Sequence, residues 1–464
     1  MRRIKIAYIG GGSKEWAHVF MNDLAFVEGF SGEIALYDID LEAAKRNQKI
    51  GNFINKDLNT KTKWSYQVYE RLDDALLDAD FVAISILPAT FDEMRSDVHE
   101  PETYAIYQTV GDTTGPGGVL RSMRTVPLYE EFARKIKAIC PDAWVLNFTN
   151  PMNLCVKTLY DVFPEIKAVG CCHEVFHTQN FLCKVLAEET GIKATRKDIS
   201  TDVSGINHFT WISQASYKNL DLLNLLDNFM LKYGESGYNE RGEVYDFLDN
   251  PFRYANLVKM DLYRRYGVLG AAGDRHLVEF MAPDWYLRDS ETIKKFKFAR
   301  TSVDERIKKR EKRLEELEKI SSGEEKPAVK ASDEEAVAMI KALLGFGTLV
   351  TNVNLPNLGQ MPGYPRGAIV ETNAVFSNDR VVPVIAKELP KPVKSMLLTH
   401  IYNLETLYEG IKKRDLKLIF SAFLHDPLCA KLSFKEAEIL FKKMVENTRA
   451  YLEPYYDLKT FLSK

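Results

Sequence analysis

The sequence is poor in cysteine and has no apolar run long enough to cross a lipid bilayer. Six cysteines in 464 residues are too few for the disulfide framework of small secreted proteins, and a reducing compartment would keep them as thiols. The opening segment MRRIKIAYIGGG has a basic start, but no signal-peptide cleavage site follows it. We therefore expect a cytoplasmic protein without membrane spans.

Charge of one sign is also scarce, because 62 Lys and Arg stand against 65 Asp and Glu and give a formal net charge of -3. This balance offers no electrostatic reason to expect nucleic acid or an anionic membrane as a partner. Hydrophobic residues make up 45% of the chain, which is typical of a globular protein with a large core. The length predicts two domains rather than one.

The first part of the chain alternates apolar strand-like runs with helical patterns. The runs are residues 4–10, 32–38, 80–87, 144–149 and 166–172. Continuous apolar strands separated by helices predict an α/β domain with a doubly wound parallel sheet of the Rossmann type. Such a sheet binds ligands beyond the carboxyl ends of its strands. We expect this domain to span residues 1–195.

The pattern changes after residue 195, where strand pairs and helical segments are mixed. We expect an α+β domain over residues 196–464 that serves substrate binding and oligomerisation. Residues 303–342 are rich in charge and predict a solvated helix, a turn and a second helix capped by Ser332 or Asp333. A part in a subunit interface is the other interpretation of this segment.

A glycine turn follows the first expected strand. Gly10, Gly11, Gly12 and Ser13 would let the backbone approach a pyrophosphate at a helix N-terminus, although the third glycine of the usual fingerprint is absent. Asp38 ends the second strand, where a carboxylate can accept hydrogen bonds from ribose hydroxyls. A 2′-phosphate would meet this negative charge, which favours NAD over NADP. The alternative is a glycine turn followed by a helix-capping aspartate.

Polar residues also follow the later strands of this domain. Asn150 precedes a proline after residues 144–149, Cys172 and His173 come after residues 166–172, and His208 lies further along. A thiolate and an imidazole together suit a borderline divalent metal and leave coordination positions open for substrate. The alternative is a core histidine and buried structural thiols.

Several motifs in this order resemble family 4 of the glycoside hydrolases along nearly the whole chain. They are GGGS near the start, VGDTTGPGG (110–118) with Arg121 and Arg124 after it, NFTNPMN (147–153), CCHEV (171–175) and GINHFTW (205–211). The form CHEV, the loop VGDTTGPGG and the segment AAGDRHLVEF (271–280) resemble the α-galacturonidase branch of that family. The resemblance implies a fold like that of lactate and malate dehydrogenases, with NAD and Mn²⁺ as cofactors.

The resemblance also implies roles for individual residues. Cys172 and His208 match the family's metal ligands, and Asn150 matches its substrate-binding asparagine. His173 follows the metal cysteine, the position of a proposed general acid. Asp274 matches the aspartate version of the catalytic base, with an ion pair to its neighbour Arg275 as the alternative.

The family mechanism is a transient oxidation. NAD⁺ takes hydride from C3 of the sugar, the metal stabilises the charge that forms when a base removes the C2 proton, the glycosidic oxygen leaves, water adds, and hydride returns. A galacturonide adds a carboxylate at C5 that an arginine would bind in a bidentate manner. Arg95 and Arg275 are the candidates, and a structural or surface ion pair is the alternative for each.

Other functions remain open at this point. Within the family, the chain could be an α-glucosidase or an α-galactosidase; outside it, a 2-hydroxy acid dehydrogenase or an NAD-binding sensor. A dehydrogenase would accumulate NADH, whereas the hydrolase would regenerate NAD⁺ in each turnover. From the family we expect a homodimer or a homotetramer.

Overall fold

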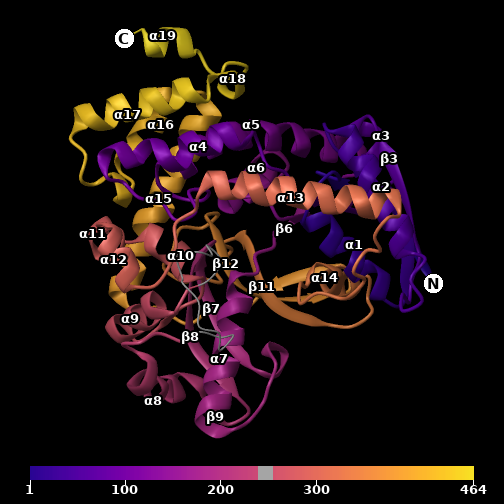
Figure 1. The fold of residues 1–464 in the computed structure, drawn as a ribbon, viewed down its shortest axis with the longest axis horizontal. Coiled ribbons are helices and arrows are strands. Elements are labelled where there is room, and N and C mark those ends of the chain that lie inside the picture. Colours follow the sequence, from indigo (N-terminus) through magenta and orange to yellow (C-terminus); the bar gives the residue numbers. More distant parts are fainter. Residues whose placement is uncertain (239–253, 464) are drawn as a thin grey trace.

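The computed structural model describes residues 1–238 and 254–463. Within these residues, thirteen strands form a single sheet, in the order β10-β8-β7-β12-β11-β6-β5-β4-β1-β2-β3, with β13 on β12 and β9 on β8. Figure 1 shows the early strands near the N-terminus and the last helices at the opposite end of the molecule. The predicted α/β class and its Rossmann-type half are confirmed.

Six parallel strands make one half of the sheet, in the order 3-2-1-4-5-6 that is typical of dinucleotide-binding folds. They are β1 (Arg2–Ile9), β2 (Phe30–Tyr37), β3 (Trp64–Tyr69), β4 (Phe81–Ile84), β5 (Trp144–Asn147) and β6 (Lys167–Gly170). Ile6, Ala7, Tyr8 and Ile9 are at most 1% exposed, because helices cover both faces of a parallel sheet. The continuous apolar runs in the sequence reflect this burial.

The remaining strands pair antiparallel and extend the same sheet. They are β7 (Ser200–Ile206), β8 (Phe209–Tyr217), β9 (Leu220–Asp221), β10 (Leu269–Gly270), β11 (Leu349–Pro356), β12 (Ile369–Ser377) and β13 (Arg380–Pro383). The two halves meet where Asn354 of β11 pairs with Gly170 of β6. Hydrogen bonds thus join the two halves into one sheet. The domain boundary at residue 195 stays a prediction.

Helices surround the sheet. Those before β7 are α1 (Trp16–Phe26), α2 (Leu41–Ile54), α3 (Leu72–Leu76), α4 (Phe91–His99), α5 (Gly115–Ile139), α6 (Met152–Val162) and α7 (Glu174–Thr190). Those from β9 to β11 are α8 (Leu222–Tyr233), α9 (Leu257–Tyr266), α10 (Asp274–Leu277), α11 (Pro283–Tyr286), α12 (Ser290–Lys295), α13 (Val303–Ser322) and α14 (Ala336–Leu343). The last are α15 (Lys391–Lys413), α16 (Leu416–Leu424), α17 (Phe434–Asn447), α18 (Arg449–Leu452) and α19 (Leu458–Leu462). Among the described residues, no helix combines the length and the apolar character that a bilayer span requires.

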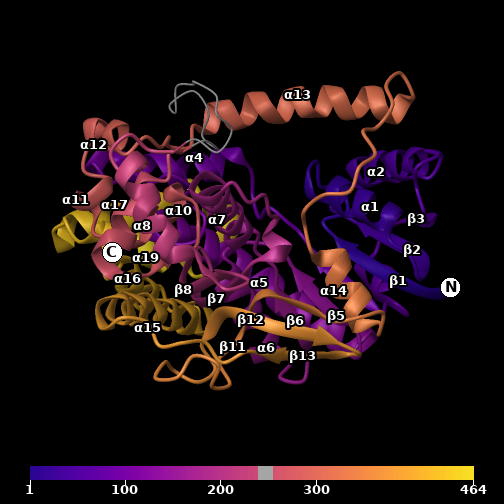
Figure 2. The same ribbon diagram turned by 90° about the horizontal axis from the view of Figure 1, so that it is seen from below.

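The charge-rich segment forms the helix that the sequence predicts, but the next helix begins differently. α13 starts after Ser302, whose hydroxyl accepts from the Glu305 N–H, and it packs across α4 and α2 (Figure 2). α14 has Glu335 at its N-cap. The expected cap by Ser332 or Asp333 is wrong, because Ser332 donates through its backbone N–H and its hydroxyl to Asp23.

Candidate functional site

The glycine turn lies between β1 and α1 and has a backbone that only glycine can adopt. Gly10 has φ +92°, and a Cβ there would lie 2.0 Å from the Ser85 carbonyl oxygen. The Gly12 N–H donates to the Asp38 carboxylate at 2.8 Å. A turn that only glycine fits, directly before a helix, is the feature expected where a backbone approaches a pyrophosphate.

Asp38 holds the turn in addition to any contact with a nucleotide. Its second carboxylate oxygen accepts from the Asp40 N–H at 2.9 Å. Burial raises the pKa of Asp38, and the two backbone N–H groups act against that shift. A carboxylate offers about four acceptor positions, so two remain for ribose hydroxyls.

Three residues from distant parts of the chain form a cluster of donors of the kind that bind metals. The donor cluster consists of Asp112, His208 and His276, whose ligand atoms lie within 4.8 Å of one another. The rings of His208 and His276 have centroids 3.8 Å apart. The three residues come from the loop before α5, the β7–β8 turn and α10, so only the fold brings them together.

Thr113 fixes the tautomer of His208. The Thr113 hydroxyl donates to Asp112 at 2.7 Å, and its oxygen lies 2.8 Å from Nδ1 of His208. Since the only hydroxyl proton is used on Asp112, Nδ1–H of His208 donates to Thr113. The Nε2 lone pair is then left to bind a metal.

Cys172 is not one of the three residues of the donor cluster, but it contacts Asn207, the neighbour of His208 in sequence. The Asn207 side chain hydrogen-bonds the Cys172 thiol and donates to Glu371 at 3.4 Å, while its backbone leads directly into His208. Burial, together with the charges of Glu371 and Glu174, raises the pKa of Cys172 well above its usual value. A bound cation would reverse this shift, because it stabilises the thiolate.

Two buried atoms near the cluster have no partner. His276 Nδ1 and Asn150 Oδ1 are buried without a hydrogen bond in the described part of the chain. The Asn150 amide donates to Asp112 at 3.4 Å. An imidazole nitrogen and an amide oxygen left open beside carboxylate and thiol donors fit a divalent metal and the hydroxyls of a sugar.

The Glu174 carboxylate lies among three histidine side chains. Its Oε1 lies 3.7 Å from His276 and 3.8 Å from both His173 and His177, and its Oε2 accepts from the Gly273 N–H. Burial by itself would raise the Glu174 pKa, but the surrounding histidines outweigh burial and lower it. Glu174 therefore stays ionised and orients several imidazoles.

His173 connects the donor cluster with the glycine turn. Its ring lies 5.3 Å from Trp16 at the start of α1 and 5.0 Å from His177. Its side chain is 32% exposed and lies 3.6 Å from Glu334. A partly exposed imidazole between the two regions is able to exchange protons with a ligand held there.

Asp274 lies in a different environment from the one that a catalytic base needs. It is fully buried, and its two oxygens accept from the N–H groups of Val258 and Lys259 at the start of α9. The carboxylate thus caps a helix. The role of Asp274 as catalytic base stays a prediction, and its hydrogen bonds give it a capping role.

Neither of the arginines expected for the uronate has a free guanidinium directed at the cluster. Arg95 pairs with Asp304 at 2.6 Å on the surface. Arg275 is buried and donates to the carbonyl groups of Thr109 and Ala299 and to the Thr301 hydroxyl. Arg95 thus forms a surface ion pair, and the Arg275 guanidinium holds backbone carbonyl groups and a hydroxyl.

Sequence reasoning gave no role to Asp112, His276 or Glu174. Asp112 and His276 lie inside the motifs VGDTTGPGG and AAGDRHLVEF, and Asp112 directly follows Gly111, which has a positive φ. Burial alone would raise the Asp112 pKa, but Arg121, His208 and His276 together lower it. The sequence marks these residues only as polar side chains within motifs. It gives neither the direction of each side chain nor its partner.

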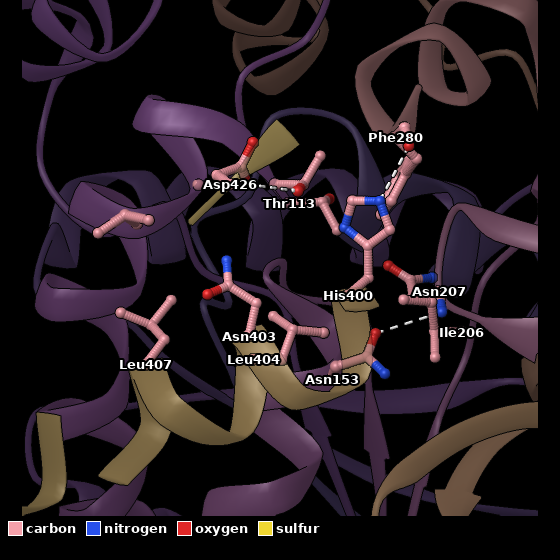
Figure 3. Close-up of a pocket in the computed structure, with 13 residues that line it drawn as sticks. Thr113, Asn153, Ile206, Asn207, Phe280, His400, Asn403, Leu404, Leu407 and Asp426 are labelled. Atoms are coloured by element: carbon pink, nitrogen blue, oxygen red, sulfur yellow. Dashed lines mark hydrogen bonds between the residues drawn. The ribbon is translucent and has the colours of Figure 1, made fainter. Parts of the chain in front are cut away.

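A small cavity lies behind the donor cluster (Figure 3). Thr113, Asn207, His400 and Asp426 are among the residues that line its volume of about 20 Å³, room for a single water rather than a sugar. Asp426 accepts from the Thr114 hydroxyl and the Gly115 N–H, and His400 bonds the Phe280 carbonyl group. The cavity therefore belongs to the packing that supports the loop of Asp112.

Comparison with known proteins covers nearly the whole chain. Residues 5–188 match the family 4 glycosyl hydrolases and residues 203–429 match the C-terminal domain of the same family. A protein named alpha-galacturonidase from Thermoanaerobacter italicus is 53% identical over 97% of this chain and 97% of its own length.

Solved structures agree with this likeness. A structure described as a putative glucosidase, lplD, from Bacillus subtilis is 47% identical, covers 96% of this chain and 100% of its own, and has a TM-score of 0.91. A 6-phospho-alpha-glucosidase from gut microorganisms, solved in complex with NAD and Mn²⁺, has a TM-score of 0.80 at 19% identity and covers 97% of this chain and 99% of its own. At that identity the second likeness concerns the fold alone.

Proposed function

The chain belongs to family 4 of the glycosyl hydrolases, and we propose that it is an α-galacturonidase that works with NAD and Mn²⁺. The observation that carries the proposal is the chain of contacts from the glycine turn through Trp16 and His173 to Glu174 and the donor cluster. It joins a nucleotide-type turn to metal-type donors. The name of the 53% identical relative supports the choice of sugar.

The residues present fit both cofactors. The turn of Gly10, Gly11, Gly12 and Ser13 with Asp38 would hold NAD, and Cys172 with His208 would hold Mn²⁺. When bound, the two groups would supply reversible hydride acceptance and stabilisation of negative charge at the sugar oxygens.

The remaining side chains bind and orient the substrate or hold protons. Asn150 presents an unpartnered buried oxygen to a sugar hydroxyl. His173, which is partly exposed and lies 3.8 Å from Glu174, would donate the proton to the leaving oxygen. Asp112, which is hydrogen-bonded to Thr113 and Asn150, replaces Asp274 as the carboxylate that faces the substrate.

A substrate panel tests this function. Purified protein with NAD⁺, Mn²⁺ and a thiol should release p-nitrophenol from the α-galacturonide faster than from the α-glucoside or the α-galactoside. The absorbance of NADH should stay flat during turnover, whereas steady accumulation of NADH would indicate a 2-hydroxy acid dehydrogenase. Preference for a neutral sugar would replace the galacturonidase assignment with another activity of the family.

Assembly and location are part of the same proposal. We expect a homodimer or homotetramer, measurable by light scattering, and a cytoplasmic protein, since its thiols need a reducing compartment. The substrate is a small galacturonide, and no nucleic acid or membrane partner is expected.

A further inference from the structure

One face of α13 is directed at the site. Arg306, Arg310 and Arg313 are spaced i, i+4 and i+7, so they share a face of the helix. At one end of this face, Arg313 donates to the Lys14 carbonyl group beside the glycine turn at 3.3 Å. Further along, the Arg310 guanidinium lies 5.3 Å from the centre of the Phe91 ring in α4.

The residues just before α13 are hydrogen-bonded to the loop that contains Asp112. The Thr301 N–H and hydroxyl both donate to the Thr109 carbonyl group. Arg306, five residues further on, is half-buried and contacts the Thr301 hydroxyl at 3.5 Å. Through Thr301 and Thr109, this contact places Arg306 beside the loop that contains Asp112.

Arg121 reaches the same place from α5. Its Nε donates to the Asn150 carbonyl group at 3.2 Å, and its charge is the main factor that lowers the Asp112 pKa against the effect of burial. The neighbouring Arg124 has a carboxylate of its own, because both of its terminal nitrogens donate to Asp97. Arg121 and Arg306 make no such ion pair with any carboxylate in the described part of the chain.

Arg121 and Arg306 therefore approach the loop of Asp112 from two helices, and neither has a carboxylate partner in the described part of the chain. Burial lowers the Arg306 pKa, and Arg121 lowers it further while Asp112 acts against the shift. A second anion placed between the two arginines would offset their repulsion. A sugar carboxylate matches the planar fork of a guanidinium with two parallel hydrogen bonds.

We propose that Arg306 of α13, together with Arg121 of α5, binds the C5 carboxylate of the galacturonide and so sets the specificity for uronides over neutral sugars. The proposal rests on the galacturonidase function. It gives α13, which reads from the sequence as a solvated helix, a direct place in substrate recognition. Arg306 and Arg121 replace Arg95 and Arg275 in this role.

The test compares an acid with its neutral isostere. Galacturonic acid and galacturonamide differ only in the group that C5 carries, a carboxylate in the acid and an amide in the other. Each is used as a competitive inhibitor of the enzyme loaded with NAD⁺ and Mn²⁺. Each is also used as a titrant in calorimetry. The unaltered protein should bind the acid more tightly than the amide. In Arg306→Gln the preference should fall by about 10- to 100-fold, the value of a lost charged hydrogen-bond pair. KM for the uronide should rise while kcat changes little.

Matched variants keep the result interpretable. Lys308→Gln removes the same charge from an exposed position of α13 and should leave the acid preference intact. Arg306→Lys keeps the positive charge but not the planar guanidinium, so it should lose part of the preference for the acid. If Arg306→Gln does not fold, this variant tests the proposal in its place. An unchanged acid preference in soluble Arg306→Gln overturns the proposal. If the unaltered protein fails to cleave galacturonides, the proposed galacturonidase function is wrong. The comparison of acid and amide binding still tests the role of Arg306 in that case.

Discussion

The glycine turn is built from neighbours in sequence, whereas the donor cluster joins residues from distant parts of the chain. Gly10, Gly12 and Asp38 directly follow two adjacent strands of one parallel sheet, and hydrogen bonds of the backbone fix them. Asp112, His208 and His276 come together only because the antiparallel half of the sheet pairs with the edge of the parallel half. The first region depends on local backbone geometry, and the second depends on side-chain networks between elements.

The largest expected effect comes from removing a donor of the cluster. His208→Asn should lower turnover of the galacturonide by about 10³-fold, because loss of a metal ligand removes several kcal/mol of charge stabilisation. NAD binding, followed by fluorescence, should stay unchanged. His425→Asn, an exposed histidine on the end of α16, serves as control. If His208→Asn also lost NAD, the two regions would not be separate.

The converse change is made at the glycine turn. Gly10→Ala should abolish NAD binding and destabilise the fold, because its Cβ would lie 2.0 Å from the Ser85 carbonyl oxygen. Gly191→Ala is the matched control: its φ is +74°, and nothing lies within 4 Å of the added Cβ. Thermal unfolding should show about 1 kcal/mol for the control, from backbone strain alone, and more for Gly10→Ala. Equal effects would mean that close approach to Ser85 does not matter.

The support of the donors should have a smaller effect. Glu371 is fully buried and accepts from Asn207, Asn352 and Asn354, and Asn352 also donates to the Cys172 carbonyl group. Glu371→Gln should weaken Mn²⁺ binding by about 10- to 100-fold, the usual range for residues that orient metal ligands. Calorimetric titration with Mn²⁺ measures this effect, with NAD affinity as the internal control. Unchanged Mn²⁺ affinity would separate this network from the metal site.

The smallest effect is one of pH on stability. Burial raises the pKa of Glu279 from 4.5 to about 7, so the folded state holds a proton that the unfolded state loses between these values. Stability is therefore greatest below pH 4.5 with respect to this group and is lost as pH rises toward 7, by at most about 1.4 kcal/mol per pH unit. In Glu279→Gln, urea unfolding between pH 5 and 7 should show a flatter profile. An identical slope would mean that Glu279 does not titrate in this range.

Much of the nucleotide half was predictable because its signals are local. The apolar runs of β1 and β2, the turn that opens α1 and the carboxylate of Asp38 follow one another at short spacing, and parallel strands bring their carboxyl ends to one edge. For the second half, the sequence indicated which motifs carry polar groups, but not which side chains face inward. Asp274 and His276 illustrate this limit, since two residues apart one caps α9 and the other joins the donor cluster.

By itself, the sequence determined the α/β class, the glycine turn with Asp38 and the family, because these depend on residues near one another and on the order of motifs. Only the tertiary structure decided that Asp112 and His276 join His208, that Asp274 and Arg275 hold backbone groups, and that Arg306 of α13 contacts Thr301. The reason is physical. The direction of a side chain at a distant contact depends on how whole elements pack, and no short stretch of sequence contains that packing.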